Sequence, residues 1–178
     1  MKILFASDVH GSRFYAQKVC ERFEDEKADL LVLLGDIYNH GPRNPLPKDY
    51  DPMGVSQLFN SKIDKLIVVK GNCDSDVDTL ISDFEFVSEF VVLVDGKKIF
   101  LQHGDKFNKD NLPKGNYDAF IYGHFHTGFI EKREKIVVAN AGSVSLPKND
   151  TANSYIVYEE GKLILKDIDG VVIKSENI

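Results

Sequence analysis

The sequence has few of the features that mark secreted, membrane-spanning or disulfide-stabilised proteins. It contains only two cysteines, Cys20 and Cys73, which cannot form a framework of several disulfides, so the cytoplasm is the expected compartment. No stretch approaches the roughly 18 continuous apolar residues that a membrane span requires. The apolar run at the N-terminus is about five residues long and is followed at once by Asp8 and His10, so we expect a buried first strand and not a signal peptide.

Positive charge is also scarce. The 22 Lys and Arg residues are outnumbered by 28 Asp and Glu residues, which gives a net charge of −6, and no basic stretch occurs. Because proteins that bind duplex nucleic acid depend on many phosphate contacts, we expect no stable nucleic-acid complex. A small anionic substrate remains compatible with this composition if positive charge is supplied locally. The 178 residues, 43% of them apolar, are expected to form one domain over residues 1–178.

The first half of the chain alternates between strand and helix patterns. Apolar runs predict buried strands at residues 2–7, 29–36 and 64–72, and helical spacing or helix signals occur at residues 12–27, 53–60 and 76–83. This order predicts a largely parallel sheet.

The second half has the character of antiparallel structure. Asp95-Gly96 and Glu160-Gly161 divide residues 90–104 and 154–168 into hairpins, and further strands are expected at residues 118–124, 134–142 and 170–175. Cys20 and the aromatic residues Phe84, Phe86 and Phe90 are interpreted as packing residues. The expected fold is α/β, with two mixed β-sheets packed together and helices outside.

Polar side chains follow five of the predicted strands. They are Asp8 and His10, Asp36, Asn72, His103, and His124 with His126. Each signal alone is weak, because a Gly-Asp or Gly-Asn pair is ordinary turn chemistry and an Asp-x-His stretch often forms a turn with a helix cap. Since ligands in open α/β sheets bind outside the carboxyl ends of the strands, the combination predicts one site in which all seven side chains meet.

Oxygen and imidazole ligands without thiolate suit a divalent ion such as Mn, Fe, Zn or Ni. Seven ligands are too many for one tetrahedral site but suffice for two ions that share a carboxylate. In an extended segment, His124 and His126 would point the same way with their backbones roughly 6.5 Å apart. Each could then bind one of two ions about 3.5–4 Å apart. The spacing leaves open the alternative that both histidines bind a single ion.

The motifs Asp-x-His, Gly-Asp, Gly-Asn-x-Asp, His-Gly and Gly-His-x-His, in this order, resemble those of the calcineurin-like metallophosphoesterase superfamily. The stretches "FASDVHGS", "LGDIYNHGPRNPLP", "GNCDSDVD" and "GSVSLPK" are similar to the YfcE-type phosphodiesterase family, and this resemblance covers nearly the whole chain. It implies a four-layer α/β/β/α sandwich and two divalent metal ions, with manganese the usual cofactor. By the same resemblance, Asp8, His10 and His126 would hold one ion, Asn72, His103 and His124 the other, and Asp36 would bridge them.

This resemblance implies hydrolysis of a small phosphate ester. Two divalent ions, two aspartates and a hydroxide sum to about +1, which suits an anionic substrate, and hydroxide would be available at neutral pH. Asn72 would help to stabilise charge on the phosphate oxygens. We expect a phosphodiesterase. The alternatives are a phosphomonoesterase or pyrophosphatase on the same metals and a non-catalytic metal-binding scaffold. A homodimer or larger homo-oligomer is a further expectation.

Cys73 departs from the superfamily pattern, in which a histidine at this place protonates the leaving oxygen and the following aspartate orients it. A thiol with the ordinary pKa of about 8.5 is mostly neutral at pH 7 and donates weakly. The catalytic interpretation therefore predicts dependence on good leaving groups, whereas Cys73 could also be a small packed residue. Asp74 is expected to cap the next helix. In the loop that follows Asp36, His40 and Arg43 either contact phosphate or only stabilise the loop.

Overall fold

A seven-stranded mixed sheet forms one half of the molecule in the computed structural model, which describes all 178 residues. Its order is β12-β11-β10-β1-β2-β3-β4. β1 to β4 run parallel, and β10 to β12 form an antiparallel meander beside β1. The bounds are β1 (Ile3–Ala6), β2 (Leu30–Leu33), β3 (Leu66–Val69), β4 (Phe86–Val87), β10 (Ser154–Glu159), β11 (Lys162–Asp167) and β12 (Val172–Asn177).

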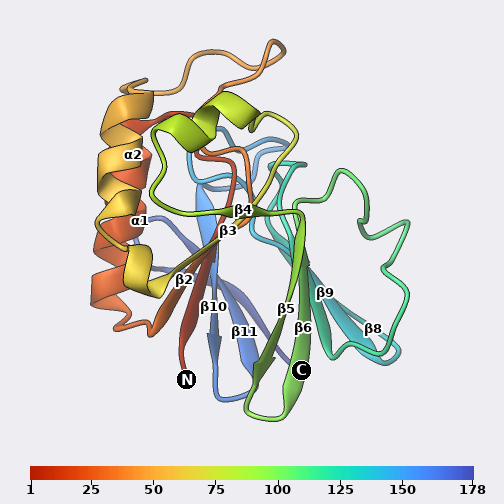
Figure 1. Ribbon diagram of the computed structural model, residues 1–178. Coiled ribbons are helices and arrows are strands. Elements are labelled where there is room, and N and C mark those ends of the chain that lie inside the picture. Colours follow the sequence, from red (N-terminus) through yellow and green to blue (C-terminus); the bar gives the residue numbers. More distant parts are fainter.

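A five-stranded sheet packs against the first, with the order β5-β6-β7-β9-β8 (Figure 1). Its strands are β5 (Glu89–Val94), β6 (Lys97–Gln102), β7 (Ala119–Tyr122), β8 (Phe129–Arg133) and β9 (Ile136–Asn140). β6, β7 and β9 are parallel, whereas β5 and β8 are antiparallel edge strands. Between the two sheets lies a core of 19 buried apolar residues, which includes Phe5, Val32, Ile121 and Ile156. Burial of this size is the main favourable contribution to folding.

Two α-helices, α1 (Arg13–Asp25) and α2 (Pro52–Asn60), cover the outer face of the seven-stranded sheet (Figure 1). Ser12 caps α1 by accepting a hydrogen bond from the Tyr15 N–H at 3.3 Å, and Asp51 caps α2 by accepting one from the Gly54 N–H at 3.0 Å. Cys20 lies on the buried face of α1, as predicted. Two 3₁₀ helices, η1 (Ile63–Lys65) and η2 (Asp76–Leu80), flank β3.

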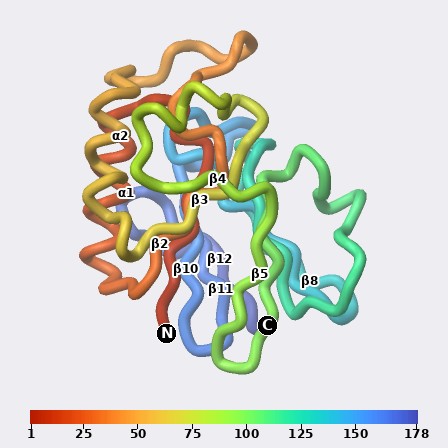
Figure 2. The backbone as a smooth tube through the Cα atoms, viewed as in Figure 1, coloured from red at the N-terminus to blue at the C-terminus, as the bar shows by residue number.

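The outer face of the five-stranded sheet is covered by the long loop between β6 and β7, which extends from the right side of the molecule in Figure 2. Phe107, Leu112 and Tyr117 of this loop pack on Phe100 and Phe120 of the sheet. Both α-helices therefore lie on the same sheet, and a loop forms the fourth layer. None of the helices is long and apolar enough to cross a membrane.

The predicted α/β fold class, with two mixed sheets packed together, is confirmed. The expected α/β/β/α order of layers differs on one side, because a loop takes the place of the second helical layer. Two short strands were not predicted: β4 has only two residues, and β8 is mostly solvent-accessible, so it lacks a clear apolar pattern. Phe84 is buried as expected, but Phe90 is 37% exposed on the edge strand β5. The loops that follow β1, β2, β3, β6 and β7 meet at the end of the molecule opposite both termini (Figure 1).

Candidate metal centre

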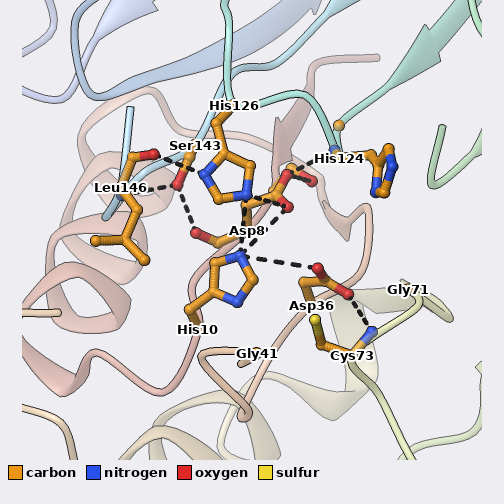
Figure 3. Close-up of polar contacts among 12 residues, drawn as sticks. Asp8, His10, Asp36, Gly41, Gly71, Cys73, His124, His126, Ser143 and Leu146 are labelled. Atoms are coloured by element: carbon orange, nitrogen blue, oxygen red, sulfur yellow. Dashed lines mark hydrogen bonds and ion pairs between the residues drawn. The ribbon is translucent and has the colours of Figure 1, made fainter. Parts of the chain in front are cut away.

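The seven candidate ligands lie together at this end of the two sheets, in two neighbouring clusters. In the first, the Asp8 Oδ1 lies 3.2 Å from the His126 Nε2 and 3.5 Å from the His10 Nε2. The two imidazole Nε2 atoms are 3.1 Å apart (Figure 3). Residues 116 positions apart in sequence thus direct their ligand atoms to one point, as the strand-end argument predicted.

The second cluster is centred on His103. Its Nε2 lies 3.1 Å from the Asn72 Oδ1, 3.2 Å from the His124 Nδ1 and 3.4 Å from the Asp36 Oδ1. The other oxygen of Asp36, Oδ2, lies 3.7 Å from the His10 Nε2 of the first cluster. Asp36 therefore faces both clusters, one with each carboxylate oxygen.

The residues present fit a bound cation. The Asp8 Oδ1 is buried and has no hydrogen-bond partner, whereas its Oδ2 accepts hydrogen bonds from the Ser7 hydroxyl at 2.6 Å and the His124 N–H at 2.9 Å. A buried carboxylate oxygen without a partner is costly, and a metal ion is one of the few groups that offsets the cost. Two groups of ligand atoms, one of Asp8, His10 and His126 and one of Asp8, Asp36 and His103, each lie within 4.8 Å of one another.

Backbone carbonyls orient three of the imidazoles. The Nδ1 atoms of His10, His103 and His126 lie 2.6 to 2.7 Å from carbonyl oxygens of Asn39, Leu34 and Leu146, respectively. In the tautomer that donates from Nδ1 to the carbonyl, the lone pair of Nε2 points into the cluster, which is the arrangement typical of metal-binding histidine.

The pKa values of the central groups follow from burial and from their charged neighbours. Burial acts to raise the pKa of Asp8, but close contact with the imidazoles of His10 and His126 outweighs it and holds this pKa well below its usual value. Burial lowers the pKa of His124. Burial of His103 is outweighed by the carboxylates of Asp36 and Asp8, which raise its pKa to about 10, so His103 must release a proton when a metal ion binds. Asp8 is thus held as a carboxylate and His124 as a neutral imidazole, and these are the forms that bind metal.

Five of the seven ligands have a left-handed backbone. They are Asp8 (φ 56°), His10 (52°), Asp36 (56°), His124 (66°) and His126 (59°). This conformation costs a non-glycine residue roughly 1–2 kcal/mol and concentrates at functional sites. The expectation that His124 and His126 lie in an extended segment is therefore wrong. The chain turns at both residues, so His124 faces His103 and His126 faces His10.

Small residues allow the segments to approach closely. A Cβ atom on Gly123 would lie 1.8 Å from the Ser7 hydroxyl oxygen and 2.6 Å from the Asp8 Oδ2. The hydroxyls of Ser143 and Ser145 both donate to the backbone carbonyl of Asp8, at 2.7 and 2.9 Å. These two serines belong to the "GSVSLPK" stretch, which therefore holds the backbone of the ligand Asp8 in place.

Asp74 does not have the role expected from the sequence. The N-cap of η2 is Ser75, so the predicted capping by Asp74 is wrong. The Asp74 carboxylate is buried and accepts hydrogen bonds from the backbone N–H groups of Asp36 (2.8 Å), Ile37 (2.7 Å) and Gly71 (2.7 Å). Burial raises its pKa to about 6, against the effect of these hydrogen bonds. Asp74 fixes the loop that carries Asp36.

Replacing Asp74 by alanine is expected to lower the free energy of unfolding by about 4 kcal/mol, because three buried N–H groups would lose their acceptor. Urea denaturation followed by circular dichroism measures this change. Asp76→Ala is the matched control, since that side chain is 99% exposed and pairs only with Lys70, and it should have little effect. Equal stability of Asp74→Ala and Asp76→Ala would contradict the assignment.

A pocket of about 600 Å³ opens over the two clusters. It is lined by the candidate ligands Asp36, Asn72, His124 and His126 and by other residues that include Arg43, Cys73, Phe125 and Lys148. Arg43 therefore lines the pocket, and its contact with phosphate stays a prediction. His40 does not line it: its ring packs at 84° to that of Tyr50, with centroids 5.4 Å apart. Lys148 was not singled out from the sequence, where its only signal is its place at the end of "GSVSLPK".

Cys73 lines the pocket beside Asp36, and its backbone N–H donates to the Asp36 Oδ1 at 2.8 Å (Figure 3). Burial and the nearby negative charge of Asp36 raise the pKa of its thiol to about 12. The thiol is therefore neutral near pH 7 and a poor proton donor, as the sequence interpretation assumed.

Comparisons with known proteins agree with this geometry. A family model for the calcineurin-like phosphoesterase superfamily domain matches residues 1–162. Phosphodiesterase YfcE of Escherichia coli K12 is 44% identical over 157 residues, which cover 87% of this chain and 85% of that protein. Phosphodiesterase MJ0936 of Methanocaldococcus jannaschii is 26% identical, over 80% of this chain and 83% of that protein.

Solved structures of known proteins share the fold of this chain. The structure of the phosphoesterase Yfce from E. coli superposes with a TM-score of 0.96 and 40% identity, and all of both chains are covered. Vps29 from Entamoeba histolytica in complex with Zn²⁺ superposes with a TM-score of 0.62 at 17% identity, over 100% of this chain and 98% of that one, which shows a shared fold alone.

Proposed function

The chain belongs to the calcineurin-like phosphoesterase superfamily, and we propose that it is a phosphodiesterase that acts on small phosphodiesters with two divalent metal ions. The observation that carries this proposal is the position of Asp36, which directs one carboxylate oxygen at His10 and the other at His103. A bridging carboxylate between two groups of ligands is what a two-ion site requires. The 44% identity to a phosphodiesterase supports the reaction class.

We assign Asp8, His10 and His126 to one ion and Asn72, His103 and His124 to the other, with Asp36 shared. The set contains oxygen and nitrogen donors, which suits Mn²⁺, and Ni, Fe and Zn are the alternatives. The thiol of Cys73 also lies within 4.8 Å of ligand atoms of His10 and Asp36, but it is left out of this set because Mn²⁺ prefers oxygen and nitrogen donors to a soft sulfur ligand.

When bound, the ions would supply a hydroxide at neutral pH, by lowering the pKa of water from 15.7 toward about 7, and positive charge beside the phosphate. The protein's own part is to hold and neutralise the substrate. Arg43 and Lys148 reach the pocket from two different loops, and neither forms an ion pair with a carboxylate. Their side chains can therefore bind the non-bridging phosphate oxygens and orient the ester.

The positive charges of Arg43 and Lys148 also favour a second candidate function. With the ions, the aspartates and a hydroxide, the centre carries about +1, which already balances the single charge of a diester. Arg43 and Lys148 add positive charge beyond that need, so a phosphomonoester or a pyrophosphate is the alternative substrate class. Analysis of the products released from each class of ester separates the two functions.

The experiment is metal reconstitution of protein that has been stripped with a chelator. Stripped protein should hydrolyse no ester. Addition of Mn²⁺, Ni²⁺, Fe²⁺ or Zn²⁺ in turn should restore release of 4-nitrophenolate from bis(4-nitrophenyl) phosphate, with about two ions bound per chain by elemental analysis. Nucleotides, cyclic nucleotides and alkyl monoesters, tested with the same preparations, define the substrate range.

Two outcomes would contradict the proposal. Hydrolysis that persists in fully stripped protein would exclude metal-dependent catalysis. Binding of ions without hydrolysis of any ester would favour the third interpretation, a metal-binding scaffold that contacts a protein partner.

A further inference from the structure

Phe125 is an apolar side chain in the wall of an otherwise polar pocket. It stands between His124 and His126 in the chain, and it carries the only phenyl ring among the 12 residues that line the pocket. The residue is 46% exposed. Exposed apolar residues are ordinary when they are scattered over a surface, but this one lies beside the metal ligands in the lining of a pocket.

The backbone fixes Phe125 relative to the metal ligands. Its N–H donates to the carbonyl of Gly123 at 2.7 Å, and the left-handed residues His124 and His126 stand on either side of it. Since both neighbours are ligands held by their own contacts, Phe125 cannot move its backbone without moving them. Its ring is a fixed part of the site.

Two perpendicular contacts hold the ring itself. It packs on the His124 imidazole with centroids 5.0 Å apart and an angle of 84°, and on the Tyr122 ring at 6.2 Å and 85°. Tyr122 is 1% exposed and belongs to the core, so it provides a rigid support. These contacts leave nearly half of Phe125 exposed, and the ring lines a pocket whose other side chains are mostly charged, amide or imidazole groups.

We propose that Phe125 determines substrate specificity by binding a flat aromatic group of the ester whose phosphate lies at the metal centre. This inference rests on the proposed function for the position of the phosphate. An aromatic group that covers Phe125 removes apolar surface from water on both sides, and stacking of aromatic rings adds to that gain. The expected substrates are aryl or nucleoside esters, and esters that carry only alkyl groups bind less tightly.

The test uses two ligands that differ only in the ring and that are not cleaved. Phenylphosphonate and methylphosphonate are titrated into manganese-loaded protein by isothermal calorimetry, so that leaving-group chemistry plays no part. Wild-type protein should bind phenylphosphonate about tenfold more tightly. In Phe125→Ala this preference should fall to about one, while Phe125→Trp should keep it.

Phe90→Ala is the matched control. Phe90 is 37% exposed but lies on the edge strand β5, outside the residues that line the pocket, so its removal should leave the tenfold preference intact. Elemental analysis of each variant shows whether the ions are still bound. An equal preference in wild type and Phe125→Ala, or no preference in wild type, would overturn the inference.

Hydrolysis of bis(4-nitrophenyl) phosphate, measured on the same samples, separates this inference from the proposed function. Hydrolysis without a preference for the aromatic ligand would reject the proposed role of Phe125 and leave the proposed phosphodiesterase function intact. A ring preference that depends on Phe125 in a protein that hydrolyses no ester would reject the phosphodiesterase and keep Phe125 as a ligand-binding residue.

Discussion

Asp36→Asn is expected to lower kcat/KM for phosphodiester hydrolysis by about a thousandfold, equivalent to roughly 4 kcal/mol of transition-state stabilisation. Asp36 faces both ligand clusters, so its substitution is expected to affect both proposed ions. The amide keeps the shape but removes a negative charge, and it turns an N–H donor toward one cluster. Steady-state kinetics with Mn²⁺ and the number of ions bound per chain both measure the effect.

Asp51→Asn provides the control for this substitution. Asp51 is the N-cap of α2, with a side chain that is 38% exposed, and asparagine caps helices about as well as aspartate. This variant should therefore keep its activity and its metal content. If Asp36→Asn kept both ions and a kcat/KM within about tenfold of wild type, the shared-ligand assignment would have to be abandoned.

Most of the fold could be predicted because the buried parallel strands have continuous apolar runs. Residues 29–36 contain β2, which is covered on both faces, and such strands lack the alternation of half-buried ones. The hairpins were visible from Asp95-Gly96 and Glu160-Gly161, whose residues all have positive φ. β8 could not be predicted, because most of its side chains are solvent-accessible and its position depends on pairing with β9.

The location of the site followed from topology, since the ends of parallel strands lie at one edge of a sheet. What could not be predicted is how each side chain is held there. The left-handed backbone of His124 and His126 is fixed by contacts with segments that are distant in sequence, such as the hydrogen bond from the His124 N–H to Asp8. Likewise, Asp74 accepts hydrogen bonds from residues up to 38 positions away, and a sequence pattern contains no record of such contacts.

Cys73→His is expected to raise the hydrolysis of alkyl phosphomonoesters, relative to aryl diesters, by about a hundredfold. Proton donation to a leaving group contributes typically 10²–10⁴-fold, and it is most effective when the pKa of the acid lies near the working pH. The Cys73 thiol, with its pKa of about 12, is far from that range, whereas an imidazole has an ordinary pKa of about 6.5. Aryl leaving groups need little help from an acid, so their rate should change least.

Relative rates for 4-nitrophenyl diesters and alkyl monoesters, measured over a range of pH, test this prediction. The histidine variant should show a new fall in alkyl-ester rate at high pH as the imidazolium loses its proton, and this fall should be absent for aryl esters. Cys73→Ser separates loss of the thiol from gain of the imidazole, so it should keep the preference of the unmodified protein for aryl esters.

Equal and fast turnover of both ester classes by the unmodified protein would mean that another group already supplies the proton. Because the pocket of about 600 Å³ offers no other histidine beyond the proposed ligands His124 and His126, that donor would have to be Lys148 or water. The Arg43 guanidinium keeps its proton at every working pH, so it is excluded.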